Sequence, residues 1–365
     1  MSAASTTLLK HPTQWSMPME LLASQFSRAV QNVTIHGPKL ERAIAAHLEV
    51  RALLEADTQM RDWGIDTRLI GSYARQTSRY PGKDVDVFLR FTKLNVWHDP
   101  EKVFAAVEQI LVAHYGSALV GGRATVQARS VKIDFTDSDT PGGEDDFSVD
   151  AVPAVPWGEH WGIPNRDRNL WSQDEKRWIL TSPIRFAEES VALSVATSSP
   201  IVNGDNAYRP IVRLLRQVRH THLGQLRPGG LYFEVLAFYA WRDGEVSGDS
   251  WAELLSATLE RVAIGLQDAS ASGLADPVLG TPMKPELTSV QWETAAGVLD
   301  QLARLAQESL ESDPCRAAQL WRQILGENDR GQVLPLPDGC GANGYTISNV
   351  SAIGSVGSDD PRGFA

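Results

Sequence analysis

The segment from Gly71 to Val87, GSYARQTSRYPGKDVDV, constrains the fold more than any other part of the chain. Gly71 and Ser72 follow a short apolar stretch and predict a tight turn, whose exposed N–H groups and hydroxyl can hold phosphate oxygens. Asp84 and Asp86 then open a second apolar stretch. Because residues i and i+2 of a strand point to the same face, these two carboxylates converge on one side. The segment therefore predicts a strand, a turn and a second strand with an acidic face.

Two carboxylates held this close repel each other, which is costly unless cations lie between them. Hard oxygen ligands of this kind favour Mg²⁺ or Mn²⁺. A third carboxylate is needed to hold two metal ions about 3.5–4 Å apart. Asp150, in the predicted strand 147–155, is the candidate, and Asp134 in the neighbouring strand is the competitor. Alone, a Gly-Ser pair is usually a plain turn and an Asp-x-Asp a solvated face, but this combination indicates a metal-dependent site.

The period of the apolar residues changes along the chain and indicates the fold class. Helices are expected at 18–33, from residue 40 to near 57, and at 100–115, and strands at 66–72, 85–91, 130–135 and 147–155. Residues 156–206 are rich in Trp, Pro and Ser and have no clear local pattern. Helices then follow at 211–222, 231–242, 250–267, 289–312 and 314–325. We expect an α+β fold, a mixed sheet with helices on it, followed by an all-helical half.

Composition excludes several classes of protein. The chain of 365 residues has 34 Lys and Arg against 45 Asp and Glu, a net charge of −11, which argues against bulk binding to DNA or RNA. The two cysteines, Cys315 and Cys340, are too few for a disulfide scaffold, a Cys-rich zinc ribbon or an iron–sulfur cluster. No apolar run approaches ~18 residues, and the start lacks a secretory signal. We therefore expect a cytoplasmic protein with no membrane contact.

The motifs together resemble a known superfamily. The set Gly71, Ser72, Arg75, Thr77, Asp84, Asp86 and Asp150-Ala-Val-Pro153-Ala154 is similar to that of the polymerase-β-like nucleotidyltransferases. The branch it resembles includes the 2′-5′ oligoadenylate synthetases and the bacterial cGAS/DncV-like nucleotidyltransferases (CD-NTases) of CBASS anti-phage systems. The resemblance spans roughly residues 20–327. It implies a mixed sheet with helices, then an all-helical lobe, with the active site in the cleft between them.

The expected organisation has four parts. These are a flexible N-terminus at 1–17, a catalytic core with N-terminal helices at 18–205, a helical lobe at 206–327 and an extended C-terminal tail at 328–365. The tail ends at Ala365 after a spacer of Gly, Ser and Asp. Some CD-NTases are attached to targets through their C-terminal residue by an E1/E2-like protein, and a flexible tail with small residues at its end suits that. The alternative, which the sequence alone favours, is an ordinary disordered terminus.

The resemblance also implies roles for particular residues. Asp84, Asp86 and Asp150 would be the catalytic carboxylates and would bind two Mg²⁺ ions, which Mn²⁺ could replace. Asp150 would lie nearest the attacking ribose hydroxyl and help to deprotonate it. The backbone of Gly71 and the hydroxyl of Ser72 would hold the triphosphate of the nucleotide.

Two further binding predictions concern the helical half. The segment 208–222 carries Arg209, Arg213, Arg216 and Arg219 and no acidic residue. Arg213 and Arg216 are predicted to clamp phosphate across the cleft, and the alternative is a solvated basic face. Tyr232 is a candidate for stacking on a base, against the alternative of a core aromatic. Relatives tend to have Ser-Tyr where this chain has Gly230-Leu231, so no nucleobase is predicted.

The sequence thus predicts a Mg²⁺-dependent nucleotidyltransferase. It would join NTPs, ATP among them, into a cyclic di- or trinucleotide messenger read by a downstream effector, releasing pyrophosphate and needing no DNA or RNA activator. The enzymatic alternatives are a linear 2′-5′ oligoadenylate synthase and a tRNA nucleotide-adding enzyme, which needs a broad basic surface. The alternative from another class is a catalytically silent antitoxin or binding module. The presence of all three aspartates argues against this alternative.

Overall fold

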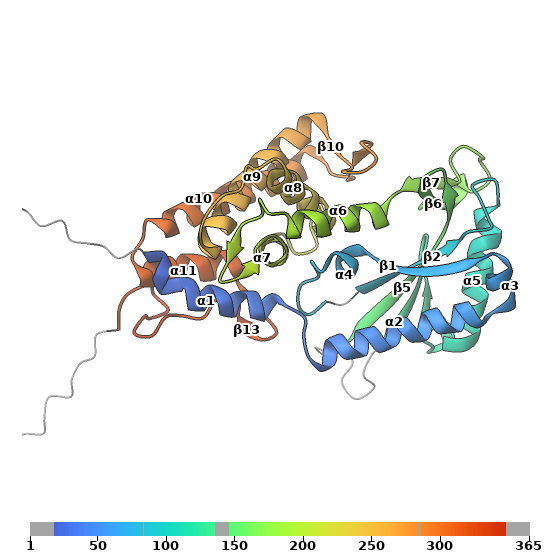
Figure 1. Cartoon of the computed structure of the whole chain (residues 1–365), viewed down its shortest axis with the longest axis horizontal. Helices are drawn as coiled ribbons and strands as arrows, with labels where there is room; N and C mark the ends of the chain where they lie inside the picture. Colours follow the sequence, from blue (N-terminus) through green and yellow to red (C-terminus); the bar gives the residue numbers. More distant parts are fainter. Residues whose placement is uncertain (1–17, 83, 136–145, 284, 348–365) are drawn as a thin grey trace, which may run out of the picture.

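The computed structural model describes residues 18–82, 84–135, 146–283 and 285–347 and has two lobes (Figure 1). One lobe is built on a seven-stranded sheet in the order β1-β2-β5-β4-β3, with β6 and β7 added beyond β5. The strands are β1 (Ile65–Ile70), β2 (Asp84–Phe91), β3 (Ala124–Val126), β4 (Val131–Phe135), β5 (Phe147–Trp157), β6 (His160–Pro164) and β7 (Trp178–Thr181). Strands β2 and β5 run parallel and the other pairs are antiparallel.

Three helices close one face of this sheet. They are α2 (Pro38–Ala56), α3 (Thr58–Asp62) and α5 (Pro100–Tyr115), the last at the predicted bounds. Helix α5 begins there because Asp99 caps it by accepting from the Glu101 N–H, and Pro100 has no N–H to satisfy. The buried residues of β2, Val85, Val87, Leu89 and Phe91, pack against these helices. The strand period of two therefore turns the intervening side chains, Asp84 and Asp86, to the opposite face.

The second lobe is helical. Its helices are α1 (Pro18–Val33), α6 (Pro183–Val195), α7 (Tyr208–Leu223), α8 (Gly230–Arg242), α9 (Trp251–Ser272), α10 (Ser289–Leu310) and α11 (Pro314–Leu325). Short two-residue strands pair at its edges: β8 (Ile201–Val202) with β9 (Asp205–Asn206), β10 (Leu274–Ala275) with β11 (Pro282–Met283), and β12 (Glu327–Asn328) with β13 (Gly331–Gln332). Helices α7, α8 and α9 form its centre (Figure 1).

The predicted division of the chain is wrong at its N-terminal end. Helix α1 was expected in the catalytic core, but its buried residues Leu22, Phe26 and Val33 lie in the core of the helical lobe. Phe26 contacts Trp321 of α11 edge to face, with ring centroids 5.1 Å apart. The apolar face of α1 is thus buried on helices contributed by the C-terminal half, a long-range pairing that local periodicity does not indicate. Residues 1–17 lie outside the described residues.

The predicted extended tail is also wrong for residues 328–347. Val333 and Leu334 are fully buried in the helical lobe. The Asn32 side chain donates to the Val333 carbonyl at 3.0 Å, and the Arg330 guanidinium lies 3.6 Å from the centroid of the Tyr80 ring. Burial of these apolar residues outweighs the Gly- and Pro-rich composition of the segment. The rest of the tail, 348–365 with Ala365, lies outside the described residues.

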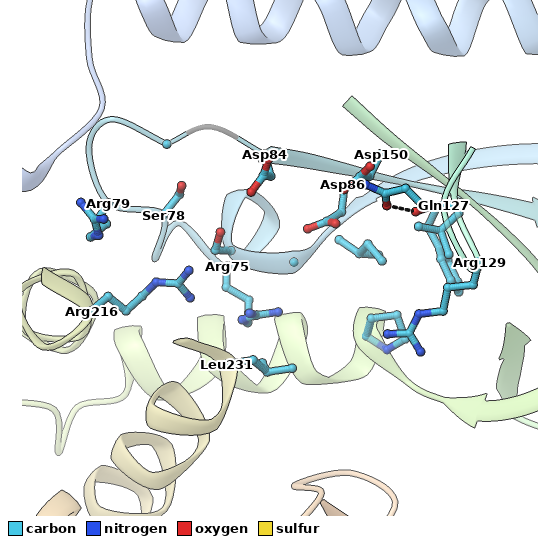
Figure 2. Close-up of a pocket in the computed structure, with 18 of the residues that line it drawn as sticks. Arg75, Ser78, Arg79, Asp84, Asp86, Gln127, Arg129, Asp150, Arg216 and Leu231 are labelled. Carbon is cyan, nitrogen blue, oxygen red and sulfur yellow. Dashed lines mark hydrogen bonds between the residues drawn. The ribbon is translucent and has the colours of Figure 1, made fainter. Parts of the chain in front are cut away.

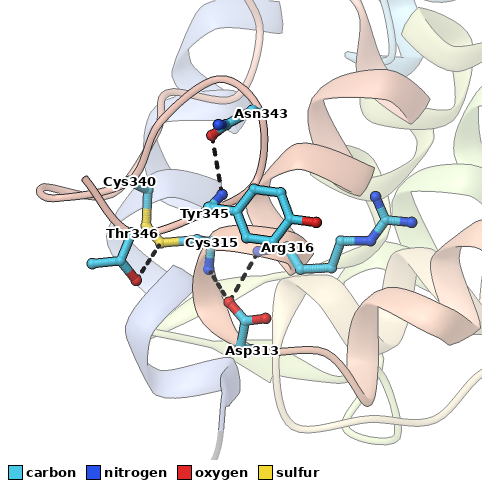
Figure 3. Close-up of a disulfide and its surroundings, with 7 residues drawn as sticks. All are labelled: Asp313, Cys315, Arg316, Cys340, Asn343, Tyr345 and Thr346. Carbon is cyan, nitrogen blue, oxygen red and sulfur yellow. Dashed lines mark hydrogen bonds between the residues drawn. A yellow bond between two sulfur atoms is a disulfide. The ribbon is translucent and has the colours of Figure 1, made fainter. Parts of the chain in front are cut away.

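The two cysteines are joined in a disulfide (Figure 3). It connects Cys315, in the first turn of α11, to Cys340 in the C-terminal segment, with Cα atoms 5.2 Å apart and a sequence separation of 25. Asp313 caps α11 by accepting from the N–H groups of Cys315 and Arg316. The sequence excluded a disulfide scaffold, and this single bond is a tether on an existing core. Among the described residues no helix is long and apolar enough to span a membrane.

Reduction of the disulfide is expected to destabilise the helical lobe by about 3 kcal/mol, because a 25-residue loop is released in the unfolded chain. Urea unfolding of the oxidised protein with and without dithiothreitol measures the difference. The Cys315→Ser/Cys340→Ser variant should unfold at the reduced protein's midpoint under both conditions. An unchanged midpoint in the wild type on reduction would contradict the tether.

Candidate active site

A cavity of about 1120 Å³ lies between the two lobes and collects most of the predicted site residues (Figure 2). Its lining includes Gly71, Ser72, Arg75, Ser78, Arg79, Asp84, Asp86, Arg129, Asp150, Arg166, Arg216, His220 and Leu231. The sheet lobe supplies the carboxylates and the Gly-Ser turn. The helical lobe supplies the opposite wall through α7 and α8. The active-site cleft was predicted at this junction.

Three carboxylates meet on two adjacent strands. In the parallel pairing of β2 with β5, Asp86 lies opposite Asp150 and Asp84 lies opposite Ser148. The Ser148 hydroxyl donates to Asp84 Oδ1 at 2.9 Å and so orients that side chain. The competing residue, Asp134 on β4, is not in the cavity lining and instead pairs with Lys132 at 2.9 Å. Asp150 is therefore the carboxylate that the fold brings to the Asp-x-Asp pair.

The three carboxylates repel one another, as the sequence predicted, and this repulsion raises the pKa values of two of them. Burial, then repulsion by Asp84, raises the pKa of Asp86 to about 6. Burial, then repulsion by Asp86 and Asp84, raises the pKa of Asp150 to about 7. Asp150 Oδ1 is buried and has no hydrogen-bond partner. An unpaired carboxylate oxygen among like charges is stabilised by a cation, so the donor set fits divalent metal ions that prefer oxygen ligands.

No three His, Cys, Asp or Glu side chains of the described chain are drawn together into a preassembled metal cage. Cations that neutralise three carboxylates would allow them to converge more closely. Figure 2 shows Asp84, Asp86 and Asp150 along the same wall of the cavity. The residues that would hold two Mg²⁺ ions are these three aspartates.

The Gly71-Ser72 turn opens a single helical turn, α4 (Gly71–Arg75), next to the carboxylates. Gly71 has φ +68°, and a Cβ placed there would lie 2.0 Å from Asp86 Oδ2. Both the backbone conformation and the close approach therefore require glycine. The helix ends at Gln76, which has φ +57° although it is not glycine. Ser72 lines the cavity together with Asp84 and Asp86.

A buried carboxylate joins the two lobes beneath this turn. Glu234 of α8 is fully buried and accepts from Arg75 Nε at 2.7 Å and from Thr77 Oγ1 at 2.7 Å. On its other side it accepts from Arg216 Nη1 of α7 at 2.9 Å. Burial alone would raise the pKa of Glu234, but the two arginines and Thr77 outweigh it and hold the pKa below its usual range. Arg75, a residue of the motif, thus pairs with a carboxylate.

The four arginines of α7 make different contacts. Arg213 donates to the Gln76 carbonyl at 2.9 Å and Arg209 to the Gln76 side chain at 2.8 Å, so both secure the left-handed end of α4. Arg219 donates to the carbonyls of the α7–α8 connection. Arg216 belongs to the cavity lining and Arg213 does not. Of the two residues predicted to clamp phosphate, the fold therefore brings Arg216 to the cavity and turns Arg213 to Gln76.

Tyr232 is also placed away from the cavity. It is buried, its ring contacts Trp292 edge to face at 5.9 Å, and its environment is the core of the helical lobe. Leu231 lines the cavity in its place, with 46% of its side chain exposed. This arrangement supports the alternative that Tyr232 is a core aromatic. The aliphatic side chain of Leu231 can make an apolar contact with a base, but it cannot stack on the base as an aromatic ring would.

Sequence reasoning missed three arginines of the cavity, Arg79, Arg129 and Arg166. Arg79 lies near Arg216, whose charge, after burial, lowers the pKa of Arg79 to about 10. The available signal was that Arg79 lies in the motif segment, seven residues after Ser72. Arg129 and Arg166 come from separate connections of the sheet lobe. Arg166 lies in the segment 163–167, which resembles the segment after the third carboxylate in the CD-NTase branch, whereas Arg129 has no local signal in the sequence.

The buried Glu234 charge is expected to be essential to the fold. Glu234→Gln leaves the buried Arg75 and the partly buried Arg216 guanidinium groups without their carboxylate, which should lower the free energy of unfolding by about 3–5 kcal/mol. Glu188→Gln on α6 is the matched control, since Glu188 and its partner Arg185 are largely exposed and should contribute less than about 0.5 kcal/mol. Urea unfolding of both variants checks this. Equal midpoints for the two would contradict the structural role of Glu234.

The raised pKa of Asp150 predicts a pH dependence for the metal-free protein. The folded state holds this proton at a pKa of about 7 against 3.8 for the free side chain, so ionisation destabilises the fold as pH rises between these values. In EDTA, Asp150→Asn should be more stable than the wild type at pH 8 by roughly 1–3 kcal/mol, and equally stable near pH 4. Asp268→Asn on the exposed face of α9 is the control. A wild type more stable than Asp150→Asn at pH 8 would refute the repulsion.

Comparisons with known proteins place this geometry in a structural class. No protein-family model matches the chain, and no curated protein matches its sequence. Solved structures do match. The CD-NTase CdnG of Bradyrhizobium diazoefficiens in complex with GTP has a TM-score of 0.62 at 16% identity, covering 83% of this chain and 94% of that one. CdnC of E. coli MS115-1 with ATP has a TM-score of 0.62 at 15% identity, covering 84% and 98%.

A more distant match extends the same class. The GTP-bound form of DncV from Vibrio cholerae has a TM-score of 0.52 at 13% identity, covering 85% of this chain and 86% of that one. The matches include both lobes, because they cover more than four-fifths of the chain. The predicted α+β class and the resemblance in fold are confirmed: the chain has the fold of the bacterial cGAS/DncV-like CD-NTases.

Proposed function

We propose that the protein is a Mg²⁺-dependent nucleotidyltransferase that joins nucleoside triphosphates into a cyclic di- or trinucleotide. The observation that carries the proposal is the convergence of Asp84, Asp86 and Asp150 beside the Gly71-Ser72 turn, in a cavity between two lobes. This set combines acidic metal ligands with a turn that can hold phosphate. Phosphoryl transfer requires both metal ions and groups that position the phosphates. A catalytically silent binding module would not require three carboxylates placed where burial and mutual repulsion raise their pKa values.

The structural neighbours support the choice of product. One is the c-UMP-AMP synthase CdnE of Rhodothermus marinus, at 17% identity and a TM-score of 0.50, and another is the cyclic AMP-GMP synthase DncV of Vibrio cholerae. Several are bound to GTP or ATP. By this likeness we assign NTPs as substrates, ATP among them, and a cyclic oligonucleotide as product. We further propose that the product is a messenger read by a separate effector in anti-phage signalling.

Each step of the proposed reaction is a nucleotidyl transfer in which pyrophosphate is the leaving group. A ribose hydroxyl oxygen attacks the α-phosphorus of an NTP, the bond between the α-phosphorus and the bridging oxygen breaks, and pyrophosphate leaves. The unpaired Oδ1 of Asp150 accepts the hydroxyl proton. Two Mg²⁺ ions on the aspartates would supply charge neutralisation and Lewis acidity. A second transfer in the same cavity closes a dinucleotide ring, and a trinucleotide ring needs a third, each releasing one pyrophosphate.

The cavity residues have separate parts in this reaction. The Ser72 hydroxyl and the Arg79 and Arg216 guanidinium groups bind the triphosphate, and the two arginines offset the negative charge that accumulates during transfer. Glu234 holds Arg216 and Arg75 in position from below, so it is a positioning residue. The apolar side chain of Leu231 contacts a base.

Incubation of the protein with all four NTPs and Mg²⁺, or Mn²⁺ in parallel, tests the proposal. Phosphatase digestion followed by mass spectrometry should reveal a resistant product with the mass of a cyclic di- or trinucleotide. A ladder of linear oligomers would replace the proposed product with that of an oligoadenylate synthase. Absence of any product with either metal would contradict the proposal for the isolated protein.

Loss of the metal ligands is expected to abolish synthesis while the fold persists. Asp84→Asn/Asp86→Asn removes two carboxylates and should lower kcat by at least about 10³-fold. Its thermal unfolding in EDTA should occur at or above the wild-type temperature, because repulsion with Asp150 is relieved. Asp174→Asn/Asp268→Asn, with both side chains exposed, is the control and should keep full activity. Activity of the first variant within tenfold of wild type would exclude these aspartates as the catalytic centre.

A further inference from the structure

After α11 the chain returns to the cavity through a short hairpin. Strands β12 and β13 pair with Asn328 opposite Gly331, so Asp329 and Arg330 form the turn between them. Asn328 and Asp329 belong to the cavity lining, together with Arg79 of the motif segment. We call residues 327–332 the C-terminal hairpin. It is distant in sequence from the motif segment, and it has no part in the reaction steps described above.

The start of the C-terminal hairpin reaches Arg79 through a buried amide. Gln217 of α7 is fully buried. Its Nε2 donates to the Leu325 carbonyl at 3.1 Å and to the Glu327 carbonyl at 3.2 Å, where the hairpin begins. Its Oε1 accepts from Arg79 Nη1 at 3.2 Å. Because carbonyls can only accept, they fix the amide nitrogen of Gln217 on their side and leave its oxygen for Arg79.

The turn of the C-terminal hairpin reaches the residue that follows Arg79. The guanidinium of Arg330 lies 3.6 Å from the centroid of the Tyr80 ring, which is buried. The Tyr80 carbonyl in turn accepts from Arg79 Nη1 at 2.6 Å. A cation on an aromatic face stabilises the position of the ring. The hairpin therefore holds Arg79 by two routes, one through Gln217 and one through Tyr80.

Arg330 is itself anchored at the end of α1. Its Nη1 donates to the carbonyls of Gln31, Asn32 and Thr34 at 3.3, 3.4 and 3.1 Å. Helix α1 has no basic residue in its last turn, so Arg330 supplies the cation that satisfies the free carbonyls at this end of the helix. Helix α1 belongs to the core of the helical lobe and α2 to that of the sheet lobe. Arg330 is thus fixed where the chain crosses between the lobes.

Arg79 needs such support because its neighbours repel it. Burial, then the charges of Arg216 and Arg219, lowers the pKa of Arg79 to about 10, and Asp329 acts in the opposite direction. Figure 2 shows Arg79 and Arg216 at the same end of the cavity. A guanidinium repelled by other guanidinium groups moves away from them unless hydrogen bonds hold it. The acceptors that hold Arg79 are the Tyr80 carbonyl and Gln217 Oε1.

We propose that the C-terminal hairpin positions Arg79 for binding the triphosphate, with Arg330 and Gln217 as the positioning residues. The inference rests on the proposed function, in which Arg79 binds the triphosphate. Neither Arg330 nor Gln217 belongs to the cavity lining, so both act through Arg79. The affinity for triphosphate then depends on a segment at the C-terminal end of the helical lobe as well as on the motif segment.

Titration calorimetry with inorganic tripolyphosphate in Mg²⁺ tests the proposal, because this probe has the triphosphate chemistry of every NTP and no base. Arg79→Ala should weaken binding by about tenfold, since a charged hydrogen-bond donor is lost. Arg330→Ala should weaken it by roughly fivefold, since Arg79 is no longer held in place. Arg79→Ala/Arg330→Ala should bind within about twofold of Arg79→Ala, because a residue that acts only through Arg79 has no effect once Arg79 is gone.

Two further variants separate positioning from general damage to the fold. Arg330→Lys keeps a cation that can lie on the Tyr80 ring and should bind tripolyphosphate within about threefold of the wild type. Arg316→Ala is the matched control: it removes hydrogen bonds to Gln319 and Glu308 in the same lobe, outside the cavity lining, and should bind like the wild type. Thermal unfolding of each variant shows that it is folded at the temperature of the titration.

The proposal is overturned if Arg330→Ala binds tripolyphosphate within about twofold of the wild type. It is also overturned if the loss in the double variant equals the product of the two single losses, because Arg330 would then act independently of Arg79. A wild type that does not bind tripolyphosphate overturns it as well. Failure of the proposed function has a different signature: Arg79 and Arg330 are coupled in tripolyphosphate binding, but natural NTPs give no product.

Discussion

The carboxylate of Glu234 is buried where the two lobes meet, and the arrangement of the cavity depends on how its charge is satisfied. Arg75 and Thr77 approach it from the segment that follows the Gly-Ser turn, and Arg216 approaches it from α7. A buried carboxylate with fewer partners would be strongly destabilising, so the three donors must stay in place. Because they come from both lobes, this requirement fixes the turn against the helical wall and holds Arg216 at the cavity.

The cavity itself is organised by opposed charges. Alternation along β2 and its pairing with β5 set three carboxylates on one wall, where burial and mutual repulsion raise the pKa values of Asp86 and Asp150. Cationic groups flank this wall at both ends, with Arg216 at one and Arg129 at the other. In a chain of net charge −11 such a distribution is local, and it suits small polyanions bound with metal ions better than a long nucleic acid.

The parts that sequence reasoning predicted are those with a local cause. The period of two in β2 shows which face Asp84 takes, and the helical period gives α5 its bounds. The rest depends on contacts that no local pattern encodes. The spacing of Arg213 and Arg216 places both near one face of a helix, yet the neighbouring Gln76 and Glu234 decide that one braces α4 while the other reaches the cavity. The burial of 333–334 and the pairing of Cys315 with Cys340 likewise depend on the helical lobe being assembled.

The central claim is that Asp84, Asp86 and Asp150 bind divalent metal ions beside a triphosphate held by the Gly71-Ser72 turn. A crystal structure with Mn²⁺ and α,β-methylene ATP, with anomalous scattering recorded at the manganese edge, tests it most directly. The account predicts two manganese peaks about 3.5–4 Å apart, coordinated by these three aspartates, with phosphate oxygens at Ser72. Manganese bound elsewhere, or a triphosphate bound away from Ser72, would contradict it.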